Sequence, residues 1–170
     1  MIRLIPTVTP EEAVRELYEA SFPLEEKRPW DSLSELLKHD RLRLLTLDKE
    51  GVFGGFLFYW QLPDYFFIEY FAVHPDMRGG GTGSHVMRLL EEQTGGIVLE
   101  VEPPLTAQAV RRIAFYERLG YQAFPEVYHQ PPHHKGFPPL ELRLMQKGLT
   151  PGETFLQVKN QLYKYVYKQP

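Results

Sequence analysis

Residues 42–83 constrain the fold more than any other segment, because a strand pattern gives way there to a helix pattern across a glycine-rich turn. Runs rich in leucine, β-branched and aromatic residues cover 42–47, 52–60 and 65–73, with short turns between them. Such short connections indicate an antiparallel meander. Residues 84–94 then have the apolar spacing of a helix. The sequence therefore predicts that strands and helices share one layered fold.

The remaining elements are predicted from local signals such as capping residues, helix-ending glycines and apolar runs. They are a first strand at 2–8, a helix starting at Thr9-Pro10, a short helix capped by Asp31 or Ser32, an interior strand at 97–101, a helix at 107–119 closed by Gly120, a long-looped hairpin of 123–128 with 140–145, and a terminal helix at 151–167. No repeat or linker divides the 170 residues, so one domain is expected.

Composition excludes several classes of function. The formal net charge of −3 gives no basic footprint for nucleic acid, and the absence of cysteine excludes disulfides, thiolate metal sites and a cysteine nucleophile. No run of apolar residues is long enough to span a membrane, and the first residues do not have the pattern of a secretory signal. We therefore expect a cytoplasmic protein, with neither a nucleic-acid partner nor a membrane partner.

The segment that carries chemistry is Phe71-Ala72-Val73-His74-Pro75-Asp76-Met77-Arg78-Gly79-Gly80-Gly81-Thr82-Gly83, which leads directly into a helix. Glycines let the backbone approach a phosphate closely, and the helix dipole adds positive potential at the same place. A plain surface turn is the alternative. The loop lacks the Lys-Ser/Thr of a P-loop, and its glycine spacing differs from that of a dinucleotide-binding fold.

Three features of the chain resemble the GNAT superfamily of N-acetyltransferases. Arg78, Gly81 and Gly83 match its R-x-x-G-x-G/A signature, after an Ala-Val-His-Pro segment that matches A-V-x-P. Residues 114–121, AFYERLGY, resemble the family's F-Y-E-[KR]-x-G-[FY] segment, and 99–101 resemble its L-E-V strand. The resemblance implies a mixed, mostly antiparallel sheet of six to seven strands flanked by helices and splayed between strands 4 and 5. A terminal helix would be additional to it.

The resemblance also implies where acetyl-CoA binds as co-substrate, without a metal. The ligand would lie between strands 65–73 and 97–101, and the implied contacts are Phe71, Ala72, Val73, Arg78, Gly79, Gly80, Gly81, Thr82 and Gly83. The N-acetyltransferase domain would cover residues 1–148, with 149–170 as a helical extension packed on the same domain. One departure is the connection 102–106, which lacks the asparagine that many family members carry there.

Four residues are candidates for proton transfer. Tyr116 occupies the family's usual position for the proton donor to the thiolate, although helical spacing also fits a core aromatic. Glu69 interrupts an apolar strand, where burial would raise the pKa of its carboxyl group, but it could instead face outward. Glu100 is the second candidate base, at the L-E-V position, and Glu102 is a weaker one.

The function that the resemblance implies is acetyl transfer from acetyl-CoA to a primary amine of a small molecule or peptide, by direct attack in a ternary complex. A non-catalytic acyl-CoA-binding module and a nucleotide-binding enzyme are the alternatives, and a homodimer stays open. Histidines 129, 133 and 134 lie in a proline-rich loop that we expect to be mobile, and the resemblance implies that this loop borders the acceptor site. We do not predict a metal site there, because no carboxylate or cysteine completes the spacing.

Overall fold

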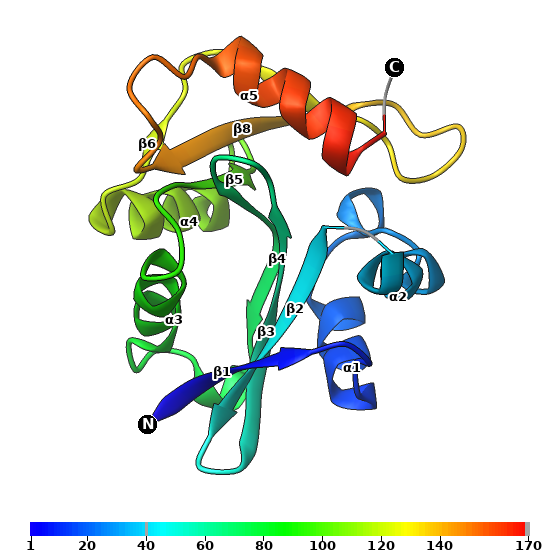
Figure 1. The fold of residues 1–170 in the computed structure, drawn as a ribbon, viewed down its shortest axis with the longest axis vertical. Helices are drawn as coiled ribbons and strands as arrows, with labels where there is room; N and C mark the ends of the chain where they lie inside the picture. Colours follow the sequence, from blue (N-terminus) through cyan, green and yellow to red (C-terminus); the bar gives the residue numbers. More distant parts are fainter. Residues whose placement is uncertain (40, 169–170) are drawn as a thin grey trace.

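The computed structural model describes residues 1–39 and 41–168, which form one sheet flanked by helices (Figure 1). The strands are β1 Ile2–Thr7, β2 Leu42–Lys49, β3 Val52–Gln61, β4 Phe66–Val73, β5 Ile97–Val101, β6 Gln122–Ala123, β7 Tyr128–Gln130 and β8 Leu140–Lys147. The α-helices are α1 Glu12–Ser21, α2 Trp30–His39, α3 Thr82–Glu91, α4 Ala107–Arg118 and α5 Phe155–Gln161. Two short 3₁₀ turns, η1 Leu24–Glu26 and η2 Pro75–Met77, and one π-helical turn, η3 Leu162–Val166, complete the described elements.

The sheet has the order β1-β2-β3-β4-β5-β8-β6, with β7 paired to β8 off this path. Every pairing is antiparallel except that of β4 with β5. These two strands pair only where Phe66–Ile68 face Ile97–Leu99, and beyond that point they separate. The predicted fold class is confirmed. The described strands number eight, because the expected first arm of the hairpin consists of two short strands, β6 and β7, that both pair with β8.

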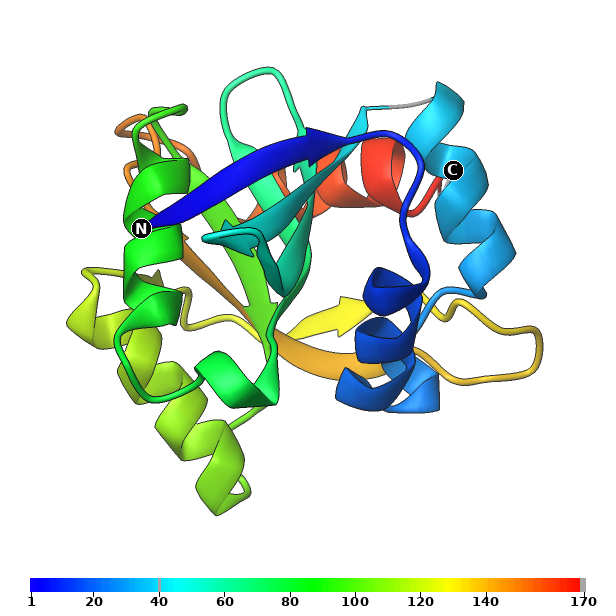
Figure 2. The same cartoon turned by 90° about the horizontal axis from the view of Figure 1, so that it is seen from below.

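Helices cover both faces of the sheet. One apolar core joins α1, α2 and the C-terminal helix to the sheet through residues such as Tyr18, Leu33 and Val158. The other core joins α3 and α4 to the opposite face through residues such as Val86 and Tyr116. Figure 2 shows α3 and α4 on one side of the strands and α1 and α2 on the other. The gap between β4 and β5 therefore opens between two helical layers.

A β-bulge interrupts β4 just where it leaves β5. Phe58 pairs with Tyr70 and Tyr59 pairs with Ile68, so Glu69 is an extra residue without a partner on β3. An extra residue in one strand shifts the alternation of side chains between the two faces. Glu69 and Tyr70 consequently contact the same side of the sheet, the side that carries Trp60.

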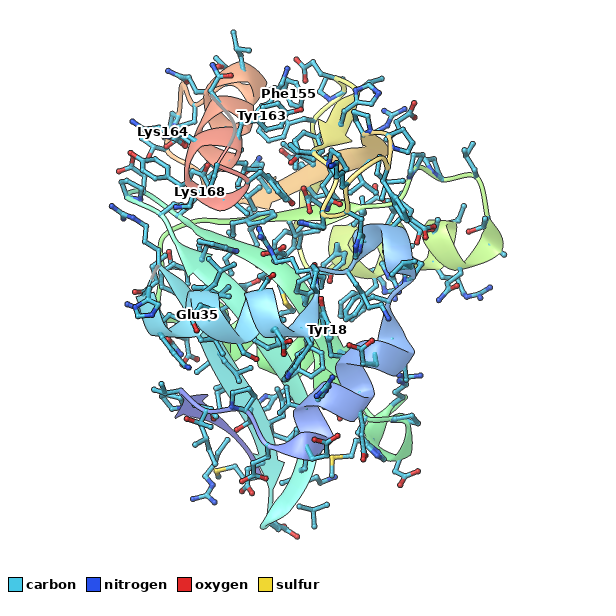
Figure 3. The ribbon with its side chains drawn as sticks, turned by 90° about the vertical axis from the view of Figure 1, so that its right-hand side faces the viewer. Tyr18, Glu35, Phe155, Tyr163, Lys164 and Lys168 are labelled. Atoms are coloured by element: carbon cyan, nitrogen blue, oxygen red, sulfur yellow. The ribbon has the colours of Figure 1, made fainter. Side chains whose placement is uncertain are left out.

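Several helix boundaries differ from the sequence prediction. Helix α1 begins at Glu12, with Glu11 and not Thr9 as its N-cap, and α3 covers Thr82–Glu91 and not 84–94. Helix α2 begins at Trp30, ahead of the expected caps at Asp31 or Ser32. The C-terminal helix begins at Phe155 and not at residue 151, because Thr154 and Gln157 form a reciprocal capping box. Figure 3 shows this helix at one end of the molecule, with Phe155 and Tyr163 on it. No helix within residues 1–39 and 41–168 is long and apolar enough to cross a membrane.

Candidate active site

A groove of about 380 Å³ runs along the glycine-rich loop. We call it the loop groove, and its lining residues are Phe71, Val73, Arg78, Gly79, Gly83, Gln108, Arg111, Arg112, Phe115 and Tyr116. It lies beside the part of β4 that has no partner on the β5 side. Three guanidinium groups in one lining supply the positive charge that a polyphosphate needs. Most of the predicted cofactor residues thus come together in one groove.

The backbone of the loop takes the shape that its glycines allow. Gly79 and Gly81 have φ angles of 85° and 77°, in the left-handed region that favours glycine. Gly81 is the N-cap of α3, so the N–H groups of the first turn lie at the loop with no partner inside the helix. At Gly83, an added Cβ would approach the Phe115 ring to 3.2 Å. These features fit a phosphate cradle.

Two side chains of the loop are tied to backbone carbonyls. The hydroxyl of Thr82 donates to the carbonyl of Met77 at 2.9 Å and is buried, which leaves only the Thr82 backbone for a ligand. The Nε of Arg78 donates to the carbonyl of Val73 at 2.9 Å, so Arg78 links the end of β4 to the loop. The loop is therefore braced from within before any ligand binds.

Tyr116 reaches the loop groove from α4. Its side chain is 9% exposed and packs against Phe115 and Tyr121. Burial raises the pKa of Tyr116 to about 12, although Arg112 acts in the opposite direction. The phenol therefore keeps its proton at neutral pH, as a proton donor must.

A second, smaller pocket of about 60 Å³ lies in the gap between β4 and β5. We call it the carboxylate pocket, and its lining residues are Phe22, Glu26, Glu69, Tyr70, Glu100, Val101, Glu102, Arg112, Gln130 and Leu142. Phe22 and Arg112 also line a cavity of about 400 Å³ that shares Phe71, Val73 and Arg78 with the loop groove. The carboxylate pocket and the loop groove are thus neighbours.

Glu100 lies on β5 at the carboxylate pocket. The Tyr167 hydroxyl lies 2.7 and 2.9 Å from its two oxygens, and the Nε2 of Gln130 donates to one of them at 3.0 Å. Burial raises the pKa of Glu100 to about 7, while the hydrogen bonds from neighbouring tyrosines act to lower it. A carboxyl group with such a pKa can accept a proton near neutral pH.

Glu69 is held very differently, although it lines the same pocket. Its side chain is 1% exposed, and its two oxygens lie 2.7 Å from Arg28 Nε and 2.7 Å from Trp60 Nε1. The guanidinium of Arg28 also donates to the carbonyl of Val166 at 2.8 Å. Glu69 is thus held in an ion pair, whereas Glu100 is held by neutral hydrogen-bond donors. The geometry thus separates the two candidate bases.

Several residues of this site carry no motif in the sequence. Arg28 lies in a segment of mixed charge whose pattern selects nothing, and Gln130 and Tyr167 lie outside every matched signature. All three are polar residues in aromatic or proline-rich surroundings, which is a weak signal. Their partners lie 30 to 138 residues away along the chain, so only the tertiary structure brings them together.

The connection 102–106, which lacks the family's asparagine, ends in a helix cap. Thr106 caps α4 by accepting a hydrogen bond from the Ala109 amide at 3.1 Å.

The histidines of the proline-rich loop contact other parts of the site. His134 Nε2 lies 2.8 Å from the carbonyl of Lys27, so the loop contacts the segment that carries Arg28. His133 is buried against Tyr167, and burial lowers its pKa to about 4. Within 1–39 and 41–168, no cluster of three metal-ligating side chains occurs.

Comparison with known proteins places this geometry in a family. The sequence matches the model of the Acetyltransferase (GNAT) family over residues 11–121. A solved structure from Bacteroides thetaiotaomicron, provisionally named a GNAT-family acetyltransferase, is 31% identical and has a TM-score of 0.90 over 99% of both chains. The chain belongs to the GNAT family of acetyltransferases.

Two more distant proteins agree with this assignment. The structure of yncA from Salmonella typhimurium with its cofactor acetyl-CoA is 20% identical, with a TM-score of 0.60 over 91% of this chain and 96% of that one, and shows the shared fold. YjbC of Bacillus subtilis (strain 168), provisionally named an acetyltransferase, is 29% identical over 99 residues. That match covers 57% of this chain and spans half the length of YjbC.

Proposed function

We propose that this chain is an N-acetyltransferase that moves an acetyl group from acetyl-CoA to a primary amine of a small molecule or peptide, by direct attack in a ternary complex. The observation that carries the proposal is the adjacency of two sites. A cationic glycine-rich groove that contains Tyr116 lies next to a carboxylate pocket that contains Glu100.

The loop groove would hold the CoA part of the co-substrate. Backbone N–H groups from residues 79–83 would receive the pyrophosphate, and Arg78, Arg111 and Arg112, which line the groove, would add positive charge. The unpaired edge of β4, residues 71–73, would bind the pantetheine arm through its backbone. Binding of acetyl-CoA by a relative of the same fold supports this assignment. Acetyl-CoA would supply an activated acyl group as its thioester.

In this mechanism, Glu100 takes the proton that the acceptor ammonium must lose before nitrogen can attack. The new C–N bond forms as the C–S bond breaks, and Tyr116 gives its proton to the departing thiolate. The nitrogen loses its second proton as the amide forms, and that proton restores the phenol of Tyr116. The products are an amide and the CoA thiol, and the one proton released in the reaction is on Glu100. Glu69 and Arg28 remain an ion pair that holds the pocket wall.

Two measurements test the proposal. Acetyl-CoA and CoA, but not ATP or NAD, should raise the midpoint of thermal unfolding. At a hundredfold excess of ligand over Kd, the free energy of unfolding should rise by about 2.7 kcal/mol. Turnover of a panel of amines is then measured as release of the CoA thiol. The chain contains no cysteine, so its own side chains add no thiol to this signal. Stabilisation without turnover of any amine would favour an acyl-CoA-binding module, and no stabilisation would remove the basis of the proposal.

A further inference from the structure

The carboxylate pocket has more negative charge than its own residues neutralise. Glu69 is paired with Arg28, and Glu100 is held by hydrogen bonds from Tyr167 and Gln130. Glu26 and Glu102 remain, and the nearest cation in the lining is Arg112.

The carboxylate of Glu26 forms no ion pair and accepts no hydrogen bond within the described residues. Burial, followed by the charge of Glu102, raises the pKa of Glu26 to about 7, and Arg112 offsets only part of this. A half-buried carboxylate in this condition is stabilised by any cation that enters the pocket.

An independent observation points to the same kind of ligand. Gln130 lines the pocket and is 4% exposed, and its Oε1 has no hydrogen-bond partner. Its Nε2 donates to Glu100 and lies 3.3 Å from the Tyr167 hydroxyl, so the orientation of the amide is fixed. The oxygen can only accept a hydrogen bond, and a buried acceptor without a partner destabilises the protein. A ligand with an N–H donor would satisfy it.

The size and walls of the pocket limit the ligand further. A cavity of about 60 Å³ has room for roughly four to six water-sized groups. Phe22, Val101 and Leu142 give it apolar walls between the carboxylates. These dimensions suit a short, unbranched aliphatic chain and not a bulky ring system.

We propose that the acceptor is a short aliphatic amine with a second cationic group, which Glu26 and Glu102 bind while Glu100 serves the reacting amine. This inference rests on the proposed function and specifies its substrate class. The carboxylates contribute little to an acceptor with one cationic group, and they repel one with a carboxylate tail.

Three acceptors with the same number of carbon atoms test the proposal: putrescine, n-butylamine and γ-aminobutyrate, which end in a cation, a methyl group and an anion. The expected order of kcat/KM is putrescine, then n-butylamine, then γ-aminobutyrate, with about tenfold between the first two. Equal values for the first two, or a preference for γ-aminobutyrate, would overturn the inference and leave N-acetyl transfer intact.

Variants identify the residues. Glu26→Gln and Glu102→Gln should each lower the ratio of putrescine to n-butylamine kcat/KM, by about fivefold or more. The matched control is Glu25→Gln, which removes the same charge from an exposed neighbour that does not line the pocket. A ratio that falls equally in the control and the pocket variants would show a general charge effect and refute the assignment.

Binding separates this inference from the proposed function. Calorimetric titration of the CoA-loaded protein with putrescine and with n-butylamine needs no turnover. Tighter binding of putrescine by about tenfold, lost in Glu26→Gln, supports the cation site even if no acetylation occurs. Equal affinities would contradict it whatever the catalytic result.

Discussion

Replacing Tyr167 by phenylalanine should move the pH profile of the enzyme without removing a catalytic group. The substitution deletes one hydroxyl and keeps the ring that lies beside Arg28 and His133. That hydroxyl is hydrogen-bonded to both oxygens of Glu100, which favours the charged carboxylate and lowers its pKa. Its loss should therefore raise the pKa of Glu100 above the value of about 7.

The size of the shift follows from the hydrogen-bond energy. A hydrogen bond to a charged group contributes about 1.5–3 kcal/mol, and one pKa unit corresponds to about 1.36 kcal/mol. The pKa should thus rise by about one to two units. The fraction of charged Glu100 at pH 7 would fall from about one half to between about one tenth and one hundredth. The rate at that pH should fall about five- to fiftyfold, and much of it should return in alkaline buffer.

Initial rates of thiol release from about pH 5.5 to 9.5 measure the acid limb of kcat/KM directly. Tyr65→Phe is the control, because Tyr65 donates to Gln161 at 2.7 Å and so ties the same C-terminal helix to the sheet away from Glu100. An acid limb that stays in place while the plateau rate drops would refute the reasoning, since it would mean that Tyr167 only supports the fold.

The remaining predictions concern the base, the acid, the loop and the buried ion pair. Glu100→Gln should lower kcat by about 10²–10⁴-fold and leave the affinity for acetyl-CoA unchanged. Tyr116→Phe should lower kcat more than it weakens acetyl-CoA binding. Steady-state kinetics measures kcat in both variants, and calorimetry measures the affinity. Gly81→Glu should abolish CoA stabilisation in thermal unfolding, because it places a bulky anion in a cradle with a φ of 77°; retained binding would put the pyrophosphate elsewhere. Arg28→Met should lower the free energy of unfolding by about 3–5 kcal/mol, since it leaves Glu69 buried without its partner; urea denaturation measures this, and Glu69→Gln in the same chain should restore part of the loss.

The glycine-rich loop and two residues of the proposed mechanism, Tyr116 and Glu100, could be predicted from the local sequence. The glycine pattern at 78–83 predicts backbone geometry directly, and the structure has Gly79 and Gly81 at positive φ. Tyr116 and Glu100 belong to segments whose resemblance to the family is visible from neighbouring residues alone.

The surroundings of these residues could not be predicted in the same way. Arg28 meets Val166 across 138 positions, and Tyr167 meets Glu100 across 67. Such contacts depend on how the helices pack on the sheet, and neighbouring residues in the sequence do not predict them. The surroundings of Glu69 could not be predicted either, because a β-bulge changes the face of the sheet to which its side chain points, and the regular alternation of a strand gives no sign of the bulge.

The same bulge gives β4 an unusual construction. Without Glu69, the neighbouring residues Ile68, Tyr70 and Phe71 would alternate regularly between the two cores, as they do now. The strand is thus a complete apolar strand into which one acidic residue has been added. One extra residue at a bulge thus supplies a buried carboxylate and leaves the neighbouring apolar side chains on their own faces, whereas the same carboxylate at a regular position of the strand would take the place of a core residue. The buried charge that the extra residue brings has its partner in Arg28, 2.7 Å away on a segment outside the sheet.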